Sequence, residues 1–457
     1  MLTCFSEKPA ATPIPITVIA SNEYAQWLGK QNDISKNWLQ SALFRGEPGN
    51  VATLPDASGK ISRVVCCVSD LKNFWGVGGL PISLPENVYE FDVTSENYDK
   101  YAIAWGLGAY QFSRYKKPNK KPAQLSLQKC QHADDITNTV EAIYLVRDLI
   151  NTPTDDMGPS QLAQVVVDLG KQFDASVKQI IGDDLLTENY ASIHTVGRAS
   201  DDAPRLLDLR WGNPAHPKVT LVGKGVCFDT GGLDLKNAAG MILMKKDMAG
   251  AAHVLGIARM VMAKALPINL RVLIPAVENS VGGNAYRPGD IIKSRKGLTV
   301  EIGNTDAEGR VVLSDALTEA ASEKPELIVD ISTLTGAARV ALGTELPALF
   351  CNNDKLAQDL ISHGEQQLDP MWRLPLYALY RDGLNSPIAD INNSSTDGYA
   401  GAIIAGLFLK EFVPDDIPWA HFDLMAWNLK SRPGKPAGGE AMAVRAVFGY
   451  LVGKYGS

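Results

Sequence analysis

The stretch Val219-Thr220-Leu221-Val222-Gly223-Lys224-Gly225-Val226-Cys227-Phe228-Asp229-Thr230-Gly231-Gly232 joins an apolar run to a charged, glycine-rich segment. The run Val219–Val222 has no alternating polar residues, which is typical of a strand buried on both faces of a sheet. Comparable β-branched runs, separated by helix-length segments, recur at three later places: Leu270–Ile274, Leu327–Ile331 and Ala420–Leu424. This order predicts an α/β fold with a mixed, largely parallel sheet flanked by helices.

A seam in the chain predicts a second, smaller domain. With 457 residues the chain exceeds one ordinary core. The stretch Lys116–Pro122 is basic and interrupted by proline, so it is typical of a linker or exposed loop. The apolar periodicity of Asp134–Asn151 predicts a helix that ends before Pro153. We therefore expect a smaller N-terminal α/β domain at 1–130, a connecting helix at 131–153 and a larger C-terminal domain at 154–457.

Composition limits the class of protein. Hydrophobic residues at 45% and charged residues at 21% are ordinary for globular proteins, which excludes a disordered or fibrous chain. The six cysteines form no C-x-x-C pair, so a reduced, cytoplasmic protein is expected. Neither a signal peptide nor a membrane-spanning run is recognisable. Residues 1–130 hold 14 Lys and Arg against 11 Asp and Glu, so the net charge of −7 comes from the later residues.

Several common catalytic motifs are absent. Phe228 stands where the dinucleotide-binding fingerprint needs its last glycine, and no Gly-Lys pair is followed by Ser or Thr as in a P-loop. There is no G-x-S-x-G elbow. The six histidines show no metal-ligand spacing such as H-E-x-x-H. Any metal in this protein is therefore expected to be held mainly by groups other than imidazole.

The heptapeptide Asn304-Thr305-Asp306-Ala307-Glu308-Gly309-Arg310 carries the densest charge. An extended chain would place Asp306, Glu308 and Arg310 on one face, because side chains two residues apart in a strand point the same way. Carboxylates so close repel each other unless a cation neutralises them, and a dication does so most effectively. The heptapeptide therefore indicates a metal site.

The glycine-rich segment offers further ligands. Asp229 ends a predicted strand, and Gly231 and Gly232 allow the backbone to approach a ligand closely. Lys224, among small and apolar neighbours, can ligate a metal as a neutral amine. Each feature also has an ordinary structural interpretation. An Asp-x-Glu-x-Arg run can be a solvated strand or turn, Asp229 can cap a helix, and the pair Lys245–Lys246 is typical of a solvated surface. His253, His421 and Cys227 fit a packed core better than a ligand set.

Taken together, these residues resemble the leucyl aminopeptidase (cytosol aminopeptidase) family of dinuclear metallo-aminopeptidases. The similarity rests on the heptapeptide Asn304–Arg310, on Val222–Gly232 with its spacing to Lys236 and Asp247, and on Leu149–Pro153. It extends from about residue 145 to the C-terminus, while residues 1–130 resemble the family only loosely. The larger domain, 154–457, is thereby expected to be the catalytic one.

The resemblance implies a role for each matching position. The ligands of the tighter metal would be Lys224, Asp229, Asp247 and Glu308. The ligands of the more exchangeable metal would be Asp229, Asp306 and Glu308, with the Asp306 carbonyl oxygen assisting. Lys236 would polarise the scissile carbonyl group and stabilise the oxyanion, and Arg310 would hold a bicarbonate ion that acts as general base on water activated by the two metals. The substrate pocket would correspond to Met244, Thr333, Leu334 and Gly336.

As a function, the resemblance implies release of N-terminal residues, leucine among them, from peptides, with two Mn2+ or Zn2+ ions per subunit. It further implies a cytoplasmic homohexamer with no membrane partner. The chain departs from the family near its end, where it reads Gly439-Glu440-Ala441-Met442 and many relatives carry Gly-Arg-Pro. We expect Glu440 to alter the rim of the pocket or a contact between subunits.

Two other functions remain open from the residues alone. A dinuclear phosphoesterase would also use carboxylate-bridged metals, but the histidine ligands usual in such sites are missing. A nucleic-acid-binding role has a faint electrostatic basis in the basic residues 1–130 and the cluster at Lys116–Lys121. Net charge and the lack of a DNA-reading motif argue against it.

Overall fold

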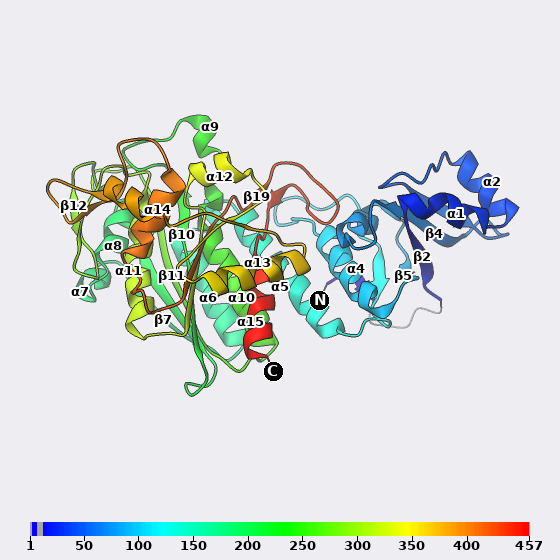
Figure 1. Cartoon of the computed structure of the whole chain (residues 1–457), viewed down its shortest axis with the longest axis horizontal. Helices are drawn as coiled ribbons and strands as arrows, with labels where there is room; N and C mark the ends of the chain where they lie inside the picture. Colours follow the sequence, from blue (N-terminus) through cyan, green and yellow to red (C-terminus); the bar gives the residue numbers. More distant parts are fainter. Residues whose placement is uncertain (1, 7–11, 457) are drawn as a thin grey trace. The chain divides into compact units, whose positions relative to one another are not determined.

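The computed structural model describes residues 2–6 and 12–456, which form two compact units (Figure 1). The first unit comprises Met1–Tyr144 and Asn428–Ala437, and the second comprises Leu145–Trp427 and Gly438–Ser457. The change from one unit to the other falls inside α5 (Ala133–Asn151), so the helix predicted at Asp134–Asn151 is confirmed. The domain limits at residues 130 and 153 stay a prediction.

The first unit is built on a six-stranded sheet with the order β1-β6-β5-β2-β4-β3, parallel throughout except at β3. Its strands are β1 (Phe5–Ser6), β2 (Ile14–Ala20), β3 (Val51–Pro55), β4 (Ile61–Val68), β5 (Val88–Phe91) and β6 (Gln124–Ser126). Its helices are η1 (Ser21–Glu23), α1 (Tyr24–Gly29), α2 (Asp33–Ser41), η2 (Phe74–Val77), α3 (Leu80–Ser83) and α4 (Ser95–Gly108). Buried aromatic rings of Phe91 and Trp105 meet edge to face between sheet and helix.

The second unit contains the predicted mixed sheet. Its strand order is β16-β15-β18-β14-β9-β11-β8-β7, with β10 paired to β11. The central strands run parallel, and antiparallel strands lie toward both edges. The strands are β7 (Ser176–Ile181), β8 (Arg205–Trp211), β9 (Lys218–Gly223), β10 (Gly225–Asp229), β11 (Asn269–Asn279), β14 (Leu327–Ser332), β15 (Ala348–Cys351), β16 (Trp372–Arg373) and β18 (Trp419–Asp423). The strands expected from the four apolar runs are thus confirmed.

Helices cover both faces of this sheet. On one face lie α8, α11 and α14, which share a single apolar core with the sheet, and Figure 1 shows α10 and α15 side by side apart from them. The helices are η3 (Thr154–Asp156), α6 (Pro159–Gln172), α7 (Asp184–Thr187), α8 (Ala191–Gly197), α9 (Ala238–Met241), η4 (Met244–Met248), α10 (Ala249–Ala263), α11 (Glu308–Ser322), α12 (Gly336–Leu342), α13 (Asp354–Gln366), η5 (Ala378–Leu384), α14 (Gly401–Lys410) and α15 (Val444–Tyr455). The remaining short strands are β12 (Ile291–Lys293), β13 (Thr299–Glu301), β17 (Ile391–Asn392), β19 (Trp427–Asn428) and β20 (Gly438–Gly439).

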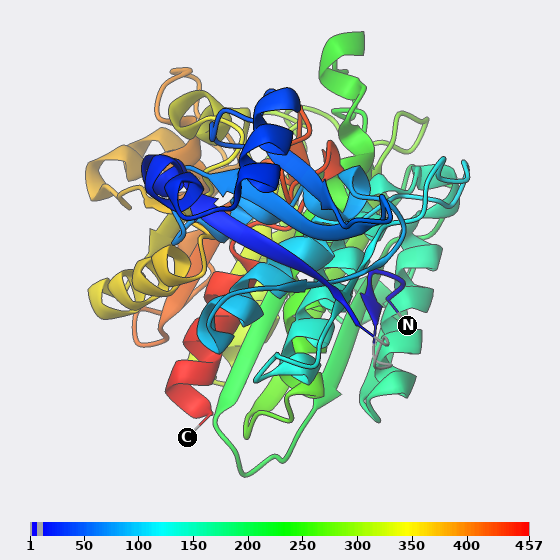
Figure 2. The ribbon, with the colours of Figure 1, turned by 90° about the vertical axis from the view of Figure 1, so that its right-hand side faces the viewer.

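A short break separates strand β9 from strand β10. The long strand β11 pairs with β9 along its first half and with β10 along its second half. Lys224 stands at the break, where its N–H donates to Ile331 O at 3.0 Å and its carbonyl accepts from Ala251 N at 2.9 Å. The chain then continues through the exposed α9, which projects from the rest of the unit in Figures 1 and 2.

Glu440 lies elsewhere than the sequence suggested. Its side chain is buried and accepts two hydrogen bonds from the buried Arg147 guanidinium, each at 3.0 Å. The expectation that Glu440 alters the pocket rim or a subunit contact is wrong for the rim, because an internal bidentate ion pair occupies both of its oxygens. Among the residues described, no helix is both long enough and apolar enough to cross a bilayer.

Candidate metal centre

Asp229 is fixed at the carboxyl end of β10. Its Oδ1 accepts hydrogen bonds from Gly231 N at 2.9 Å and from Asn279 Nδ2 at 2.8 Å. Gly231 and Gly232 have φ values of +88° and +65°, which a glycine adopts without strain. The turn therefore folds back beside the carboxylate. Carboxyl ends of parallel strands are the usual place for ligands in such sheets.

The heptapeptide Asn304–Arg310 has a different local structure from the predicted one. Residues 304–307 form a turn and α11 begins at Glu308, so the expected extended chain is wrong. The turn is held by Thr305, whose Oγ1 donates to Gly231 O at 2.6 Å and whose carbonyl accepts from Tyr286 OH at 2.6 Å. The first of these bonds joins the heptapeptide to the glycine-rich turn that follows β10.

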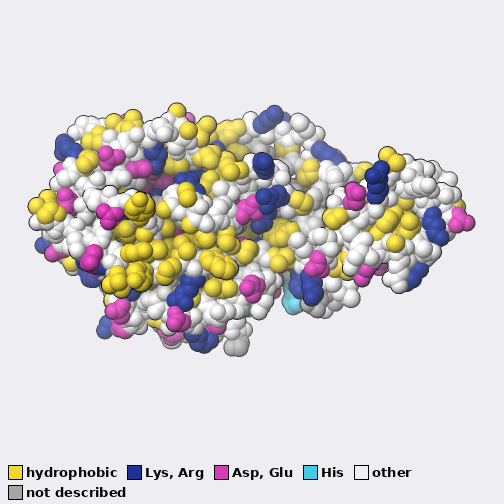
Figure 3. All heavy atoms as spheres, turned by 45° about the horizontal axis from the view of Figure 1, so that its top comes forward, with side chains coloured by type: hydrophobic (Ala, Val, Ile, Leu, Met, Phe, Trp, Pro, Cys, Tyr) yellow, Lys and Arg dark blue, Asp and Glu magenta, His cyan; other side chains and the backbone are white. Residues whose placement is uncertain are grey.

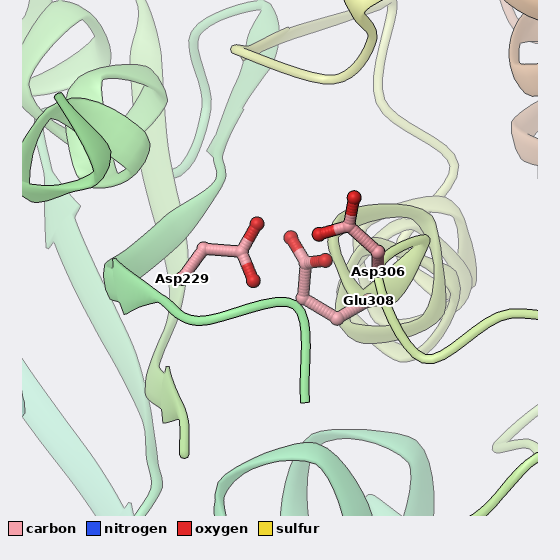
Figure 4. A group of neighbouring side chains, drawn as sticks. All are labelled: Asp229, Asp306 and Glu308. Carbon is pink, nitrogen blue, oxygen red and sulfur yellow. The ribbon is translucent and has the colours of Figure 1, made fainter. Parts of the chain in front are cut away.

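The carboxylates nevertheless converge. One oxygen atom from each of Asp229, Asp306 and Glu308 lies within 4.8 Å of the others. Figure 4 shows the three carboxyl groups facing one another, Asp229 from the end of β10 and the other two from the start of α11 and the turn before it. Carboxylates this close raise one another's pKa values unless cations neutralise them.

Lys224 closes the cluster from the break between β9 and β10. Its Nζ lies 2.6 Å from Asp247 Oδ2 and 2.7 Å from Glu308 Oε1, and the side chain is almost fully buried. A Cβ at Gly309 would lie 2.6 Å from this Nζ, so glycine at that position lets the lysine reach the start of α11. Burial opposes the charge, but the carboxylates of Asp247, Glu308 and Asp229 outweigh it and raise the pKa of Lys224 above its ordinary value.

The acidic groups differ in their protonation. Burial, followed by the charge of Asp247, raises the pKa of Asp229 to about 6. Burial and then the charge of Asp229 raise the pKa of Glu308 well above its usual range. Burial also opposes the charge of Asp247, but Lys224 and Lys246 more than compensate and lower the pKa of that carboxyl. Repulsion between the neighbouring carboxylates is thus only partly compensated by the protein.

One buried oxygen shows what the cluster lacks. Glu308 Oε2 has no hydrogen-bond partner in the described part of the chain, although it is inaccessible to solvent. An uncompensated carboxylate oxygen at such depth is costly. Hard divalent cations prefer carboxylate oxygens, and a dication among these groups would satisfy both the orphan oxygen and the mutual repulsion. The residues therefore fit a metal site.

Lys236 pairs with the two carboxylates that Lys224 does not pair with. Its Nζ is 2.8 Å from Asp229 Oδ2 and also pairs with Asp306 Oδ1. Burial disfavours its charge, yet the nearby carboxylates, Asp229 first, raise the pKa of Lys236 above its ordinary value. A lysine that is charged and partly exposed at this position can donate to an oxygen of a bound molecule.

A cavity of about 380 Å3 opens beside these groups. Its lining includes all five predicted metal-binding side chains, Lys236, and all four predicted pocket residues. The lining residues are Lys224, Asp229, Lys236, Asn237, Gly240, Met244, Lys246, Asp247, Asp306, Glu308, Thr333, Leu334, Thr335, Gly336, Arg339 and Leu424. Segments as far apart in the sequence as those of Lys224 and Leu424 therefore border one space.

Arg310 is the predicted site residue that does not line this cavity. It is buried in the first turn of α11, where its Nη1 donates to Asn393 O at 2.8 Å. Its Nε has no partner among residues 2–6 and 12–456. Burial lowers the pKa of Arg310 to about 10, although Glu308 and Asp423 favour its charge.

Sequence reasoning missed three residues that shape the site. Lys246, predicted at a solvated surface together with Lys245, is instead 3% exposed and lines the cavity. Burial lowers its pKa to about 8, with Asp247 opposing that shift. Asp423 accepts from Leu334 N at 2.9 Å and from Thr335 Oγ1 at 2.6 Å, and Asn279 bridges Asp229 and Thr305. A polar residue ending an apolar strand is the one signal that marks Asp423 and Asn279 in the sequence.

The structural interpretation of the histidines is confirmed. His253 is buried in α10, bonded to Ala249 O at 2.6 Å and accepting from Met442 N at 3.0 Å. The buried His421 ring lies 2.5 Å from Asp330 Oδ1. Neither residue lines the cavity. Cys227 is fully buried as well.

Models of two protein families match the chain. The catalytic domain of the cytosol aminopeptidase family matches residues 144–448, and the N-terminal domain of M17 aminopeptidases matches residues 14–128. A probable cytosol aminopeptidase of Chlamydia abortus is 43% identical over 318 residues, which is 68% of this chain and 63% of that relative. The alignment thus spans less than two thirds of the Chlamydia protein.

Solved structures match nearly the whole chain. The crystal structure of a cytosol aminopeptidase from Coxiella burnetii has a TM-score of 0.96 at 51% identity and covers 99% of each chain. The bottromycin maturation enzyme BotP in complex with Mn has a TM-score of 0.87 at 31% identity, covering 97% of this chain and 100% of that one. The chain belongs to the cytosol aminopeptidase family, whose members are metal-dependent peptide hydrolases.

Proposed function

We propose that this protein is a two-metal aminopeptidase that releases N-terminal residues, leucine among them, from peptides. The observation that carries the proposal is the convergence of Asp229, Asp306 and Glu308, with Glu308 Oε2 buried and unpartnered in the described chain. The family's metal dependence and the Mn complex of the BotP structure support the same chemistry. Mn2+ and Zn2+ are both compatible with oxygen ligands plus one amine.

Each metal has its own proposed ligands. The tighter ion is assigned to Lys224, Asp229, Asp247 and Glu308, and the exchangeable ion to Asp229, Asp306 and Glu308 with the Asp306 carbonyl oxygen. Asp229 and Glu308 are therefore shared. Lys224 must lose its proton to ligate, and metal binding accordingly releases protons. Thr333 Oγ1 donates to Asp247 Oδ1 at 2.6 Å and orients that carboxylate.

The remaining side chains position and stabilise the reacting groups. When bound, two dications acidify water and polarise a carbonyl group. Lys236 donates to the oxyanion that develops on the scissile carbonyl, since its Nζ already lies among the carboxylates beside the cavity. Arg310 would hold a bicarbonate ion that would serve as general base, and the Nε that has no partner in the described chain is compatible with that assignment.

Substrate selection follows from the residues that line the cavity. The free α-amine of a peptide would bind a metal held by the carboxylate cluster, so only the first residue would reach the scissile position. Met244, Thr333, Leu334 and Gly336 are proposed to receive its side chain, and all four line the cavity. Asp423 holds the Leu334–Thr335 backbone in place by accepting its N–H groups.

Three wider assignments accompany the activity. We assign catalysis to residues 154–457, with 1–130 as an N-terminal domain of unassigned role and 131–153 as the connecting helix. A cytoplasmic homohexamer is proposed as the assembly. Large apolar side chains exposed on the second unit support it, and Figure 3 shows hydrophobic side chains gathered on one face of that unit. Among the most exposed are Val340, Leu379 and Tyr399.

The test is hydrolysis by metal-loaded protein. Purified protein is stripped with chelator, reloaded with Mn2+ or Zn2+, and assayed with leucine anilide and leucine amide while bound metal is counted by elemental analysis. We expect activity to vanish with the metal and return with two ions per chain. Turnover of a phosphate ester without amide hydrolysis would contradict the proposal. Gel filtration at monomer mass would contradict the hexamer alone.

A further inference from the structure

Lys246 is a buried cation without a partner. Its side chain is 3% exposed, and the described chain offers its Nζ neither a hydrogen bond nor a carboxylate at salt-bridge distance. Its neighbour Lys245 behaves differently, because Lys245 Nζ donates to Asn151 O at 2.6 Å and lies over the Trp427 ring. Burying an unpaired ammonium is costly, so such a group is retained where a bound molecule supplies its counter-charge.

Arg339 adds a second cation to the same wall. It lines the cavity from α12, and its Nη1 donates to Met425 Sδ at 3.4 Å. In the part of the chain that the structure describes, no carboxylate pairs with it. A sulfur acceptor is weak and uncharged, so the guanidinium keeps its capacity for an anion.

The other two cations of the cavity are already engaged. Lys224 contacts Asp247 and Glu308, and Lys236 contacts Asp229 and Asp306. All four carboxylates of the cavity are therefore held by this pair, and divalent cations would engage them further. Asp247 acts on Lys246 only at longer range, and in the described chain no carboxylate lies within salt-bridge distance of Lys246 or Arg339.

Both free cations border the proposed side-chain pocket. Lys246 and Met244 belong to the same turn, η4. A Cβ built at Gly336 would lie 3.2 Å from Arg339 Nη2, which places the guanidinium directly against that pocket residue. The pocket that leucine would enter thus carries two positive charges on its wall.

We propose that Lys246, assisted by Arg339, is a specificity-determining residue that binds the carboxylate of an acidic first residue, glutamate or aspartate, in the substrate. This inference rests on the aminopeptidase activity proposed above and names its preferred substrate class. A charge-assisted bond to a carboxylate in this pocket favours glutamate over glutamine, which has the same shape without the charge.

The experiment compares matched substrates and matched variants. Manganese-loaded protein is assayed with the anilides of glutamate, glutamine and leucine, first as wild type and then as Lys246→Met and Lys245→Met. Methionine keeps the length of lysine, and replacing an unpartnered buried ammonium should not harm folding, which thermal unfolding checks. Lys245→Met is the control, because that lysine lies next in sequence but outside the cavity.

We expect wild-type kcat/KM to favour the glutamate anilide over the glutamine anilide, and Lys246→Met to lower that ratio by about 10- to 100-fold, the usual worth of a charged hydrogen bond. Lys245→Met should leave the ratio unchanged and hydrolyse leucine anilide as wild type does, and both variants should keep their manganese. An equal preference for glutamate and glutamine in wild type, or an unchanged ratio in Lys246→Met, would overturn the inference.

Two other outcomes are separable. Lys246→Met could instead erase discrimination between a dipeptide and its C-terminal amide, which would place the anion on the leaving side and overturn the assignment to the first residue. Failure of metal-loaded wild type to hydrolyse every anilide would reject the proposed function itself.

Discussion

Carboxylates are compensated by positive charge in different ways at the two ends of α11. Near its C-terminal end, an ion-pair cluster that we call the Arg271 network joins β8, β9 and β11 to the helix. Its members are Asp208, Arg210, Lys218, Arg271, Arg295, Glu319 and Glu323. Arg271 Nη2 lies 2.7 Å from both Asp208 and Glu319. Every carboxylate there faces at least one guanidinium.

At the N-terminal end of α11 the carboxylates face one another instead. Asp229, Asp306 and Glu308 cluster with two lysines, and one oxygen of Glu308 is left without a partner in the described residues. The comparison teaches how to tell a structural charge cluster from a binding one. A network balanced by its own cations stabilises the fold, whereas one short of positive charge is completed by an external cation.

Removing a carboxylate from the metal centre should have the largest effect on metal binding and activity. Asp247→Ala deletes a proposed ligand and the ion-pair partner of Lys224 at 2.6 Å. We expect loss of bound metal and a fall in kcat/KM of about 10^4-fold or more, since water activation and carbonyl polarisation disappear together. Elemental analysis and leucine-anilide kinetics measure both. Asp359→Ala, a surface carboxylate paired with Lys355, serves as control. Full metal content in Asp247→Ala would contradict the ligand assignment.

In the Arg271 network, we expect a substitution to lower the stability of the fold rather than the activity. Arg271→Met leaves Asp208 and Glu319 without their shared guanidinium, and breaking a buried ion network costs about 3–5 kcal/mol. Urea unfolding at neutral pH measures the loss. Because the metal ligands lie at the far end of α11, the folded fraction should keep its metal and its kcat. Lys355→Met, at an exposed pair, should cost less than about 1 kcal/mol. Loss of metal from Arg271→Met would show that the two ends are coupled.

Lys236→Met separates charge stabilisation from metal binding. The side chain contacts Asp229 and Asp306 but is the proposed donor to the oxyanion. We expect kcat to fall by about 10^2- to 10^3-fold, the usual effect of removing one oxyanion donor, with both metals retained. Single-turnover kinetics with elemental analysis tests this. If Lys236→Met and Asp247→Ala lost metal to the same extent, the two roles would be misassigned.

The sheet was predictable because buried parallel strands have a simple sequence pattern. Val219–Val222 and Leu327–Ile331 are apolar apart from Thr220 and Asp330, and both became central strands. The start of α11 was not predictable in the same way. Alternating charges at Asp306, Glu308 and Arg310 fit a strand, yet tertiary contacts decide the conformation: Thr305 is bonded into the Gly231 turn, and Gly309 packs on Lys224.

The metal ligands were likewise easier to predict from the sequence than the residues that line the pocket. Asp229 and Glu308 stood out because acidic residues beside glycines are unusual within core-like sequence. Lys246 did not, because a Lys-Lys pair looks the same whether it is solvated or buried. Within the turn η4 the two side chains diverge, one to Asn151 O and the other to the cavity. Only the packing of that turn against β10 determines which lysine is buried.

The smallest expected effect is a change with pH in the stability that Glu323 contributes near the C-terminal end of α11. Burial opposes the charge of Glu323, but Arg210, Lys218 and Arg271 outweigh it and lower the pKa of this carboxyl to about 2. A lowered folded-state pKa means that its stabilisation is complete above the unfolded value of 4.5 and is lost as pH falls toward 2. Glu323→Gln should therefore be less stable than wild type by about 1 kcal/mol at pH 7, since the group is partly exposed and screened.

That gap should narrow steadily between pH 4.5 and pH 3, because Glu323 becomes protonated in the unfolded chain while the folded chain keeps it ionised, which favours unfolding of wild type but not of the variant. Urea unfolding of both proteins at pH 7, 4 and 3 measures it, and added salt should shrink the gap at pH 7. Glu365→Gln, an exposed carboxylate on α13, controls for the change in net charge. A gap that widened on acidification would mean that Glu323 is held protonated, so the balanced end would need an external cation just as the metal centre does.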